Sequence, residues 1–201
     1  MTQKMSLREI HKADTRQRLL DAASRVFDRD GYDAATVDQI SSEAGASRPT
    51  FYSHFRDKEQ VLEELMSEYI LRAVPYMEKL PSVEPSIDDL RLWLYDVGKF
   101  LKKEKALFSL LNQVVGHRLP GSRDYGYEVC SAWVQGLAER SSSFAAAINP
   151  KVENLYARAR AELLIVEIIW AGANYMTDSE DEFMNAKVDI VARSLHDFMT
   201  S

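Results

Sequence analysis

The sequence has a single cysteine, Cys130, among its 201 residues. One cysteine excludes an intrachain disulfide and any zinc site built on several cysteines, and such chains are typical of a reducing compartment. We therefore expect a fold that needs no disulfide, no bound metal and no other cofactor.

Glycine and proline are also scarce, with eight and six residues, and no long apolar run is present. The most apolar stretch, residues 161–173, is interrupted by Glu162 and Glu167, and the first fifteen residues lack the apolar segment of a signal peptide. The composition, 46% hydrophobic and 28% charged, is typical of a folded chain. We expect a cytoplasmic protein without membrane contact.

No segment alternates polar and apolar residues with the period of a β-strand, whereas apolar residues recur at helical spacing. The sequence therefore predicts an all-α fold of about nine helices. We expect these helices over residues 15–30, 37–44, 48–55, 57–75, 86–103, 106–115, 123–140, 150–175 and from about 179 onward, with a loop over 141–149.

Two short helices near the N-terminus carry their own start and stop signals. Thr36 and Gln39 have the spacing of a capping box, Gly45 can take a positive φ, and Ser47 can cap a helix that holds Pro49 in its first turn. A tight turn between two short helices is typical of a helix-turn-helix, whose second helix enters the major groove of DNA.

The net charge of −6 is unevenly distributed. Residues 1–60 hold ten basic and ten acidic side chains, so the whole excess of acid lies beyond residue 60. Residues 1–29 have seven basic and four acidic side chains, a local excess that suits a phosphate backbone.

The block 36–58, TVDQISSEAGASRPTFYSHFRDK, resembles the signature of the TetR family of transcriptional regulators. The positions that match are Phe27, Gly31, Thr36, Ala44, Gly45, Phe51, Tyr52, His54, Phe55, Lys58 and Glu59. The resemblance implies a DNA-binding three-helix bundle over residues 1–56 and a helical body over residues 57–201 for ligand binding and dimerisation. It also implies a repressor that leaves a near-palindromic double-stranded operator when an inducer displaces the helix that starts at residue 57.

The first turns of a recognition helix face the base edges, so we expect Arg48, Pro49 and Thr50 to read the sequence. Hydroxyl, imidazole and ammonium groups nearby suit phosphates. The residues that we expect to contact phosphates are Thr36, Ser47, Tyr52, His54 and Lys58.

The body offers an apolar surface for a homodimer, because residues 163–170 are apolar nearly all round and the last helix has an apolar stripe. Small residues at 171–173 would allow close approach of helices. The residues that we expect at the interface are Leu164, Ile168, Ile169, Phe183, Ile190, Val191 and Leu195.

Large rings gather between residues 93 and 133, with few clustered basic residues. Together with the resemblance, this indicates a small apolar or aromatic inducer rather than a polyanion. The candidate lining residues are Trp93, Phe100, Phe108, His117, Tyr125, Tyr127, Cys130 and Trp133.

Two other hypotheses remain open. A helical enzyme would depend on His117 and Cys130, but no acid, glycine loop or metal-ligand spacing accompanies them. A DNA-binding protein with a closed core would use the same rings for packing alone. An enclosed void among Trp93, Phe108 and Trp133 would favour a ligand over simple packing.

Overall fold

The computed structural model describes residues 6–107, 109–110, 124–149, 155–174 and 182–200, and this part of the chain is helical without a strand. The all-α prediction is confirmed. The helices are α1 Leu7–Asp30, α2 Val37–Glu43, α3 Arg48–His54, α4 Lys58–Met77, α5 Ile87–Lys103, α7 Tyr125–Ala138, α8 Ser142–Ala147, α9 Leu155–Asn174 and α10 Glu182–Thr200.

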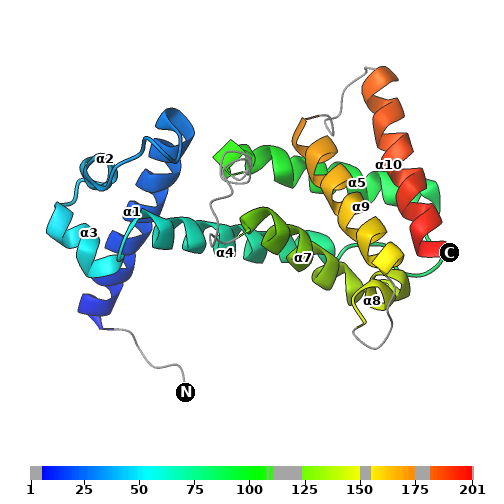
Figure 1. Cartoon of the computed structure of the whole chain (residues 1–201), viewed down its shortest axis with the longest axis horizontal. Helices are drawn as coiled ribbons and strands as arrows, with labels where there is room; N and C mark the ends of the chain where they lie inside the picture. Colours follow the sequence, from blue (N-terminus) through cyan, green and yellow to red (C-terminus); the bar gives the residue numbers. More distant parts are fainter. Residues whose placement is uncertain (1–5, 108, 111–123, 150–154, 175–181, 201) are drawn as a thin grey trace.

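The helices form two groups that α4 connects (Figure 1). Helices α1, α2 and α3 pack together as a small head at the N-terminal end of α4. The remaining helices form the body, in which α5 packs against α9 and α10, and α7 packs against α4, α8 and α9. Helix α4 therefore touches both the head and the body.

Helix α1 is longer than the sequence pattern predicts. It begins at Leu7 instead of residue 15, because Ser6 and Glu9 form a capping box: the Glu9 amide donates to Ser6 Oγ at 3.3 Å, and the Ser6 amide donates to a Glu9 carboxylate oxygen at 2.7 Å. The extra turns are exposed, so they carry no apolar stripe that would have announced them.

The predicted loop over residues 141–149 is wrong, because residues 142–147 form the short helix α8. Phe144 is fully buried against the ring of Phe198 in α10, with the ring centroids 4.8 Å apart. One buried ring thus stabilises a turn of helix in a stretch whose serines and alanines read as a loop.

The helix expected over residues 106–115 is seen in part, at 105–107 and 109–110, and residues 111–115 lie outside the described residues. Pro75 does not stop α4, which continues to Met77. Gly172 permits a close crossing of α9 and α5 within one chain, because a Cβ there would overlap the Leu101 side chain and lie 3.5 Å from the Gly98 Cα.

Candidate nucleic-acid interface

The two short helices of the head begin on side-chain caps, as the sequence predicts. The Gln39 amide donates to Thr36 Oγ1 at 3.2 Å, and the Thr36 amide donates to Gln39 Oε1 at 2.8 Å. At the start of α3 the Thr50 amide donates to Ser47 Oγ at 3.2 Å. These bonds satisfy amides that a helix start leaves without a partner.

Gly45 makes the turn between α2 and α3 with a φ of 62°, the left-handed region in which a side chain is strained. The turn is held from outside by α1, since the Arg18 guanidinium donates to the Ala44 carbonyl oxygen at 3.1 Å. The angle between the two helices is therefore fixed by a backbone turn and by a side chain from a third helix.

The start of α3 presents an exposed surface. Pro49 is exposed and Thr50 is partly exposed. The Arg48 side chain is 59% exposed and lies 3.3 Å from an exposed Asp38 carboxylate. Exposed ion pairs of this kind contribute little to stability, so Arg48 can exchange this partner for a base edge at low cost.

The other side of α3 is core. Phe51 and Phe55 are buried with ring centroids 5.7 Å apart. Tyr52 is 48% exposed, lies edge-on to Phe51 at 5.5 Å, and has the Arg48 guanidinium 5.8 Å above its ring. Tyr52 therefore connects the buried face of α3 to its exposed face.

His54 is partly buried at the end of α3, and its Nδ1 atom is buried without a hydrogen-bond partner. Burial, helped by the positive charges of Arg16 and Lys12, lowers the pKa of His54 below its ordinary value. The imidazole is therefore neutral at neutral pH and can offer a phosphate at most one neutral N–H donor.

Lys58 does not extend outward from the head. Its ammonium group donates to the carbonyl oxygens of Tyr32, Asp33 and Ala35, at 2.8, 3.0 and 3.1 Å, and lies 4.6 Å from the centroid of the Tyr32 ring. An ammonium has three donors, and three carbonyls occupy them. Lys58 thus fastens the first turn of α4 to the loop between α1 and α2.

Arg16 forms a second connection between the head and α4. Its guanidinium binds both carboxylate oxygens of Glu64 in α4, donates to the His54 carbonyl oxygen at the end of α3, and lies 4.1 Å from the centroid of the Phe55 ring. The Arg16 and Glu64 side chains are 32% and 28% exposed. One side chain thereby joins α1, α3 and α4.

Most basic residues of α1 are already paired. Arg25 and Arg29 both contact Glu43, at 3.0 and 3.4 Å, and this pairing lowers the pKa of the Glu43 carboxyl. Within the part of the chain that the structure describes, no carboxylate pairs with the exposed Arg8 or Lys12. The local excess of positive charge is therefore concentrated at the N-terminal end of α1.

Only some of the residues predicted to line a ligand site lie in the core of the body. Trp93, Phe100, Tyr125 and Trp133 are buried, and Cys130 is partly buried, which raises the pKa of its thiol to about 11. Tyr127, in contrast, is 46% exposed, and its hydroxyl accepts a hydrogen bond from Arg158. Tyr127 therefore lies outside the core, and Phe108 and His117 lie outside the described residues.

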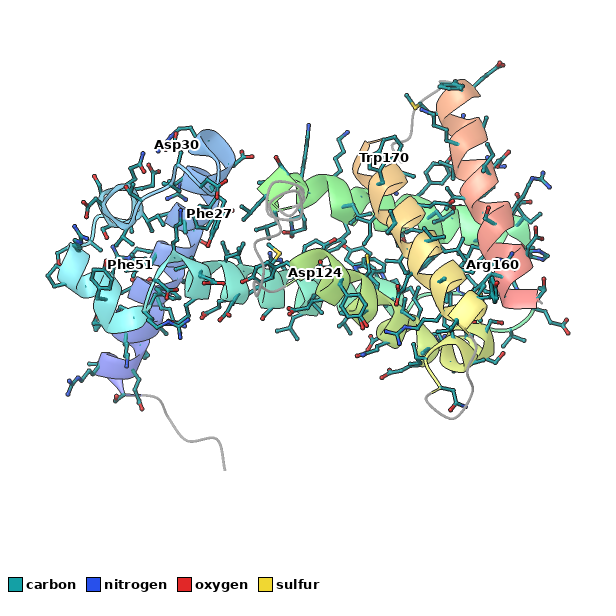
Figure 2. The ribbon with its side chains drawn as sticks, in the orientation of Figure 1. Phe27, Asp30, Phe51, Asp124, Arg160 and Trp170 are labelled. Carbon is teal, nitrogen blue, oxygen red and sulfur yellow. The ribbon has the colours of Figure 1, made fainter. Side chains whose placement is uncertain are left out.

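The residues of the predicted dimer surface differ in their exposure. Five of its seven residues are buried inside the chain's own core, where they are at most 6% exposed: Leu164, Ile168, Ile169, Val191 and Leu195. Phe183 and Ile190 are 67% and 63% exposed. Within the apolar run 163–170, the exposed side chains are Leu163, Val166 and Trp170, which lies near the C-terminal end of α9 (Figure 2).

Sequence reasoning also missed Arg16 as a functional residue. A signal was present, because Arg16, Leu20, Ala23 and Phe27 share the spacing of the apolar stripe of α1. A charged residue on such a stripe needs a partner of opposite charge, and the partly buried Glu64 is that partner.

In the described ranges no helix is long and apolar enough to cross a membrane, and no group of three potential metal ligands occurs.

One family of known proteins matches the head and the start of α4. Residues 19–65 match the model of bacterial regulatory proteins of the tetR family. The HTH-type transcriptional regulator SrpR of Pseudomonas putida is 44% identical over 54 residues, which is 27% of this chain and 25% of SrpR. The chain thus matches only a quarter of that relative's length.

Other similarities extend over the body. The HTH-type nicotine-responsive transcriptional repressor HdnoR of Paenarthrobacter nicotinovorans is 28% identical over 178 residues, 86% of this chain and 89% of HdnoR. The structure of Salmonella enterica GusR superposes with a TM-score of 0.65 at 20% identity, over 94% of this chain and 96% of GusR. The likeness to GusR concerns the fold alone.

Proposed function

The chain belongs to the tetR family of bacterial regulatory proteins, and from that premise we propose that it is a dimeric repressor that releases a near-palindromic DNA operator when a small molecule binds. The observation that carries the proposal is the exposed start of α3, with Arg48 and Pro49 on a helix whose cap and turn are fixed by Ser47 and Gly45. Such a protein acts on the bacterial chromosome, in the cytoplasm.

On DNA, the exposed end of α3 enters the major groove, with Arg48, Pro49 and Thr50 toward the bases. The hydroxyl of Tyr52 and the caps at Thr36 and Ser47 lie beside the phosphates. The buried carbonyl partners of Lys58 support a different role for that residue, which is to hold the head on α4.

We place the dimer interface on the exposed stripes of α9 and α10, which pack against one another in the body. Leu163, Val166 and Trp170 on α9 and Phe183 and Ile190 on α10 are all at least 49% exposed. Exposed apolar residues gathered on two neighbouring helices mark an association surface. A second copy of this chain covers this surface and sets the distance between the two α3 helices.

Coupling between ligand and DNA runs through α4. Its first turn is fastened to the α1–α2 loop by Lys58, and its second turn to Arg16 of α1 by Glu64. Arg16 in turn donates to the His54 carbonyl oxygen at the end of α3. Farther along, the ring of Tyr69 contacts the ring of Phe100 of α5 in a tilted arrangement, with ring centroids 5.6 Å apart. A ligand that prefers a displaced α4 therefore moves the head, with a coupling of about 1–3 kcal/mol.

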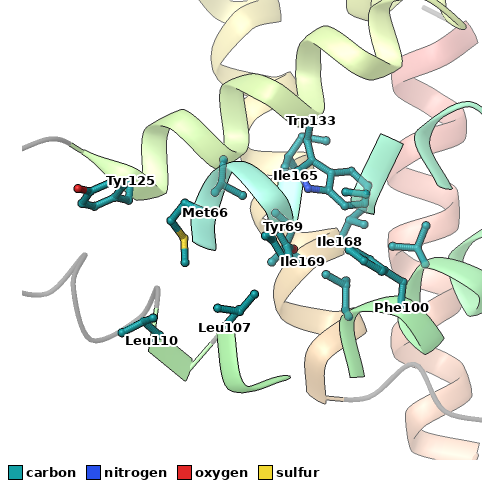
Figure 3. Packing of buried hydrophobic residues seen from close by; sticks show 14 of the residues in the cluster. Met66, Tyr69, Phe100, Leu107, Leu110, Tyr125, Trp133, Ile165, Ile168 and Ile169 are labelled. Carbon is teal, nitrogen blue, oxygen red and sulfur yellow. The ribbon is translucent and has the colours of Figure 1, made fainter. Parts of the chain in front are cut away.

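We infer an apolar or aromatic ligand for the body. The buried rings of Phe100 and Trp133 lie among aliphatic side chains (Figure 3), and the ring of Trp93 is buried as well. A charged ligand would lose its hydration there without gaining a partner. The nicotine-responsive relative, which aligns over most of the chain, supports a small organic molecule as the ligand.

We place the boundary between the DNA-binding domain and the ligand-binding domain between residues 56 and 57, just before α4.

The test is selection of bound sequences from a randomised DNA library. We expect a near-palindrome whose half-sites lie about 34–36 Å apart, or a multiple of that distance. Arg48→Ala should relax the preference at one base pair of each half-site, at a cost of about 1–3 kcal/mol. Arg140→Ala, an exposed substitution in the body, is the matched control. Weak binding without sequence preference would refute the proposal.

A further inference from the structure

In the described part of the body, the Tyr69 hydroxyl on α4 and the Trp133 indole nitrogen on α7 are buried without a hydrogen-bond partner. The two side chains are 3% and 0% exposed, so water does not reach them from the surface. Folded proteins leave few buried polar atoms unsatisfied, because each one costs stability. Trp93 shows the usual arrangement, since its indole N–H donates to the Tyr76 carbonyl oxygen at 2.8 Å.

The two unsatisfied groups lie close together. Figure 3 shows Tyr69 and Trp133 in one neighbourhood, with Phe100 beside them. Burial raises the pKa of the Tyr69 hydroxyl, and the Trp133 indole N–H, which is directed toward the Tyr69 oxygen, opposes that rise, although the two groups fall short of the geometry of a hydrogen bond. Both groups can therefore direct a hydrogen toward a third atom.

The surroundings are uncharged. Met66, Leu107 and Ile169 are buried nearby (Figure 3), and the Cys130 thiol, three residues before Trp133, is neutral because burial raises its pKa to about 11. The charged residues that act on Tyr69 are Glu104 and Arg72, which neutralise each other in an ion pair of 3.0 Å. A net charge placed among these groups would lack a counter-charge.

We propose that Tyr69 and Trp133 form the polar end of the ligand site, and that the ligand is a neutral, mainly apolar molecule with one hydrogen-bond acceptor such as a carbonyl oxygen. An indole N–H can only donate, a phenol can donate, and one carbonyl oxygen has two lone pairs to receive both. The inference rests on the proposed ligand-responsive function and adds to it the chemistry of the ligand.

The position of Tyr69 connects this contact to DNA. Tyr69 lies five residues beyond Glu64 on the same helix, and Glu64 holds Arg16 of the head. An acceptor that binds the Tyr69 hydroxyl therefore acts directly on α4, rather than through a side chain of another helix.

The test observes the indole N–H groups of the full-length protein by NMR after ¹⁵N labelling of tryptophan. The probes are acetophenone and 2-acetylnaphthalene, which carry a carbonyl; their hydrocarbon counterparts, ethylbenzene and 2-ethylnaphthalene, which do not; and benzoate, which carries a charge. We expect at least one ketone to move the Trp133 N–H signal downfield, as a new hydrogen bond does. The Trp93 signal, already bonded to Tyr76, is the internal control.

The matched variant is Tyr69→Phe, which removes the hydroxyl and keeps the ring. We expect it to weaken ketone binding about tenfold and hydrocarbon binding less than twofold, while benzoate binds at least tenfold more weakly than acetophenone to the unmodified protein. The ligand-free variant should keep or raise its Tm, because an unsatisfied hydroxyl has been removed. A lower Tm would show that the hydroxyl has a partner in the free protein and would overturn the proposal.

Equal binding of ketone and hydrocarbon, an unmoved Trp133 signal, or stronger binding of benzoate would each overturn the proposal. Operator selection is run on the same preparation. If the operator is found and the ketones fail, the ligand assignment alone is wrong. If no operator is found, the proposed function fails as well.

Discussion

The Lys58 ammonium group is surrounded by three backbone carbonyl oxygens from residues 32, 33 and 35. We predict that Lys58→Met lowers the free energy of unfolding by about 2–3 kcal/mol, because hydrogen bonds to a charged donor are lost and partly buried carbonyls lose their partner. Urea denaturation measures this change.

The same variant separates the two roles of Lys58. The logarithm of the binding constant falls with the logarithm of the salt concentration. Each phosphate contact makes this slope steeper by about one, whereas a structural bond does not change it. We expect the slope for operator binding to stay the same in Lys58→Met. Lys102→Met, exposed in the body, controls for the loss of one positive charge. A slope reduced by one unit would restore the phosphate role.

His54 makes the stability of the head depend on pH. Its pKa is lowered in the folded chain by burial and by Arg16 and Lys12, so the unfolded chain takes up a proton first as the pH falls through the ordinary value of 6.5. Stability should therefore decrease from pH 7.5 toward pH 5.5. His54→Gln should flatten this part of the curve, as thermal unfolding across the range can show. An unchanged curve would contradict the assignment.

Among the helices, α4 is held to the head by the pair of Arg16 and Glu64. We predict a coupling energy of about 1–2 kcal/mol from a double-mutant cycle with Arg16→Met and Glu64→Met, since both side chains are mostly buried and the contact is bidentate. The pair of Asp14 and Arg18, 65% and 49% exposed, is the matched control and should give about 0.3–0.5 kcal/mol. Equal couplings would show that the connection is no stronger than a surface pair.

Sequence predicts the helix-turn-helix well because its signals are local. Thr36, Gly45 and Ser47 act within three residues of their own positions, so the spacing alone indicates the caps and the turn. The role of Lys58 could not be predicted in this way, because its partners lie 23 to 26 residues away. Only the folded backbone brings those carbonyls to it.

The outward side of α9 could not be predicted for a different reason. Residues 163–170 are apolar on almost every side, so no periodicity distinguishes the face toward α5 from the face toward a partner. The packing decides: Leu164 and Ile168 point into the body, and Leu163 and Val166 point out.

For the whole molecule, we predict that Leu163→Glu together with Ile190→Glu converts a dimer into monomers. A carboxylate buried in an apolar contact without a partner costs about 3 kcal/mol or more, which weakens association at least a hundredfold. Sedimentation equilibrium measures the change. Leu92→Glu, a 69% exposed site on α5, is the control and should leave the dimer intact. A dimer that survives the double substitution would place the interface elsewhere.

The two fastenings of α4 define which segment of the chain can be transplanted. Lys58 and Glu64 tie the first two turns of α4 to the head, whereas the contact of Tyr69 with Phe100 belongs to the body. A chimaera joined at residue 56 would separate the reading head from its own anchors. A chimaera joined after Glu64 keeps Lys58 and Glu64 with the head. The operator specificity of this head can then be combined with the ligand-binding body of another regulator.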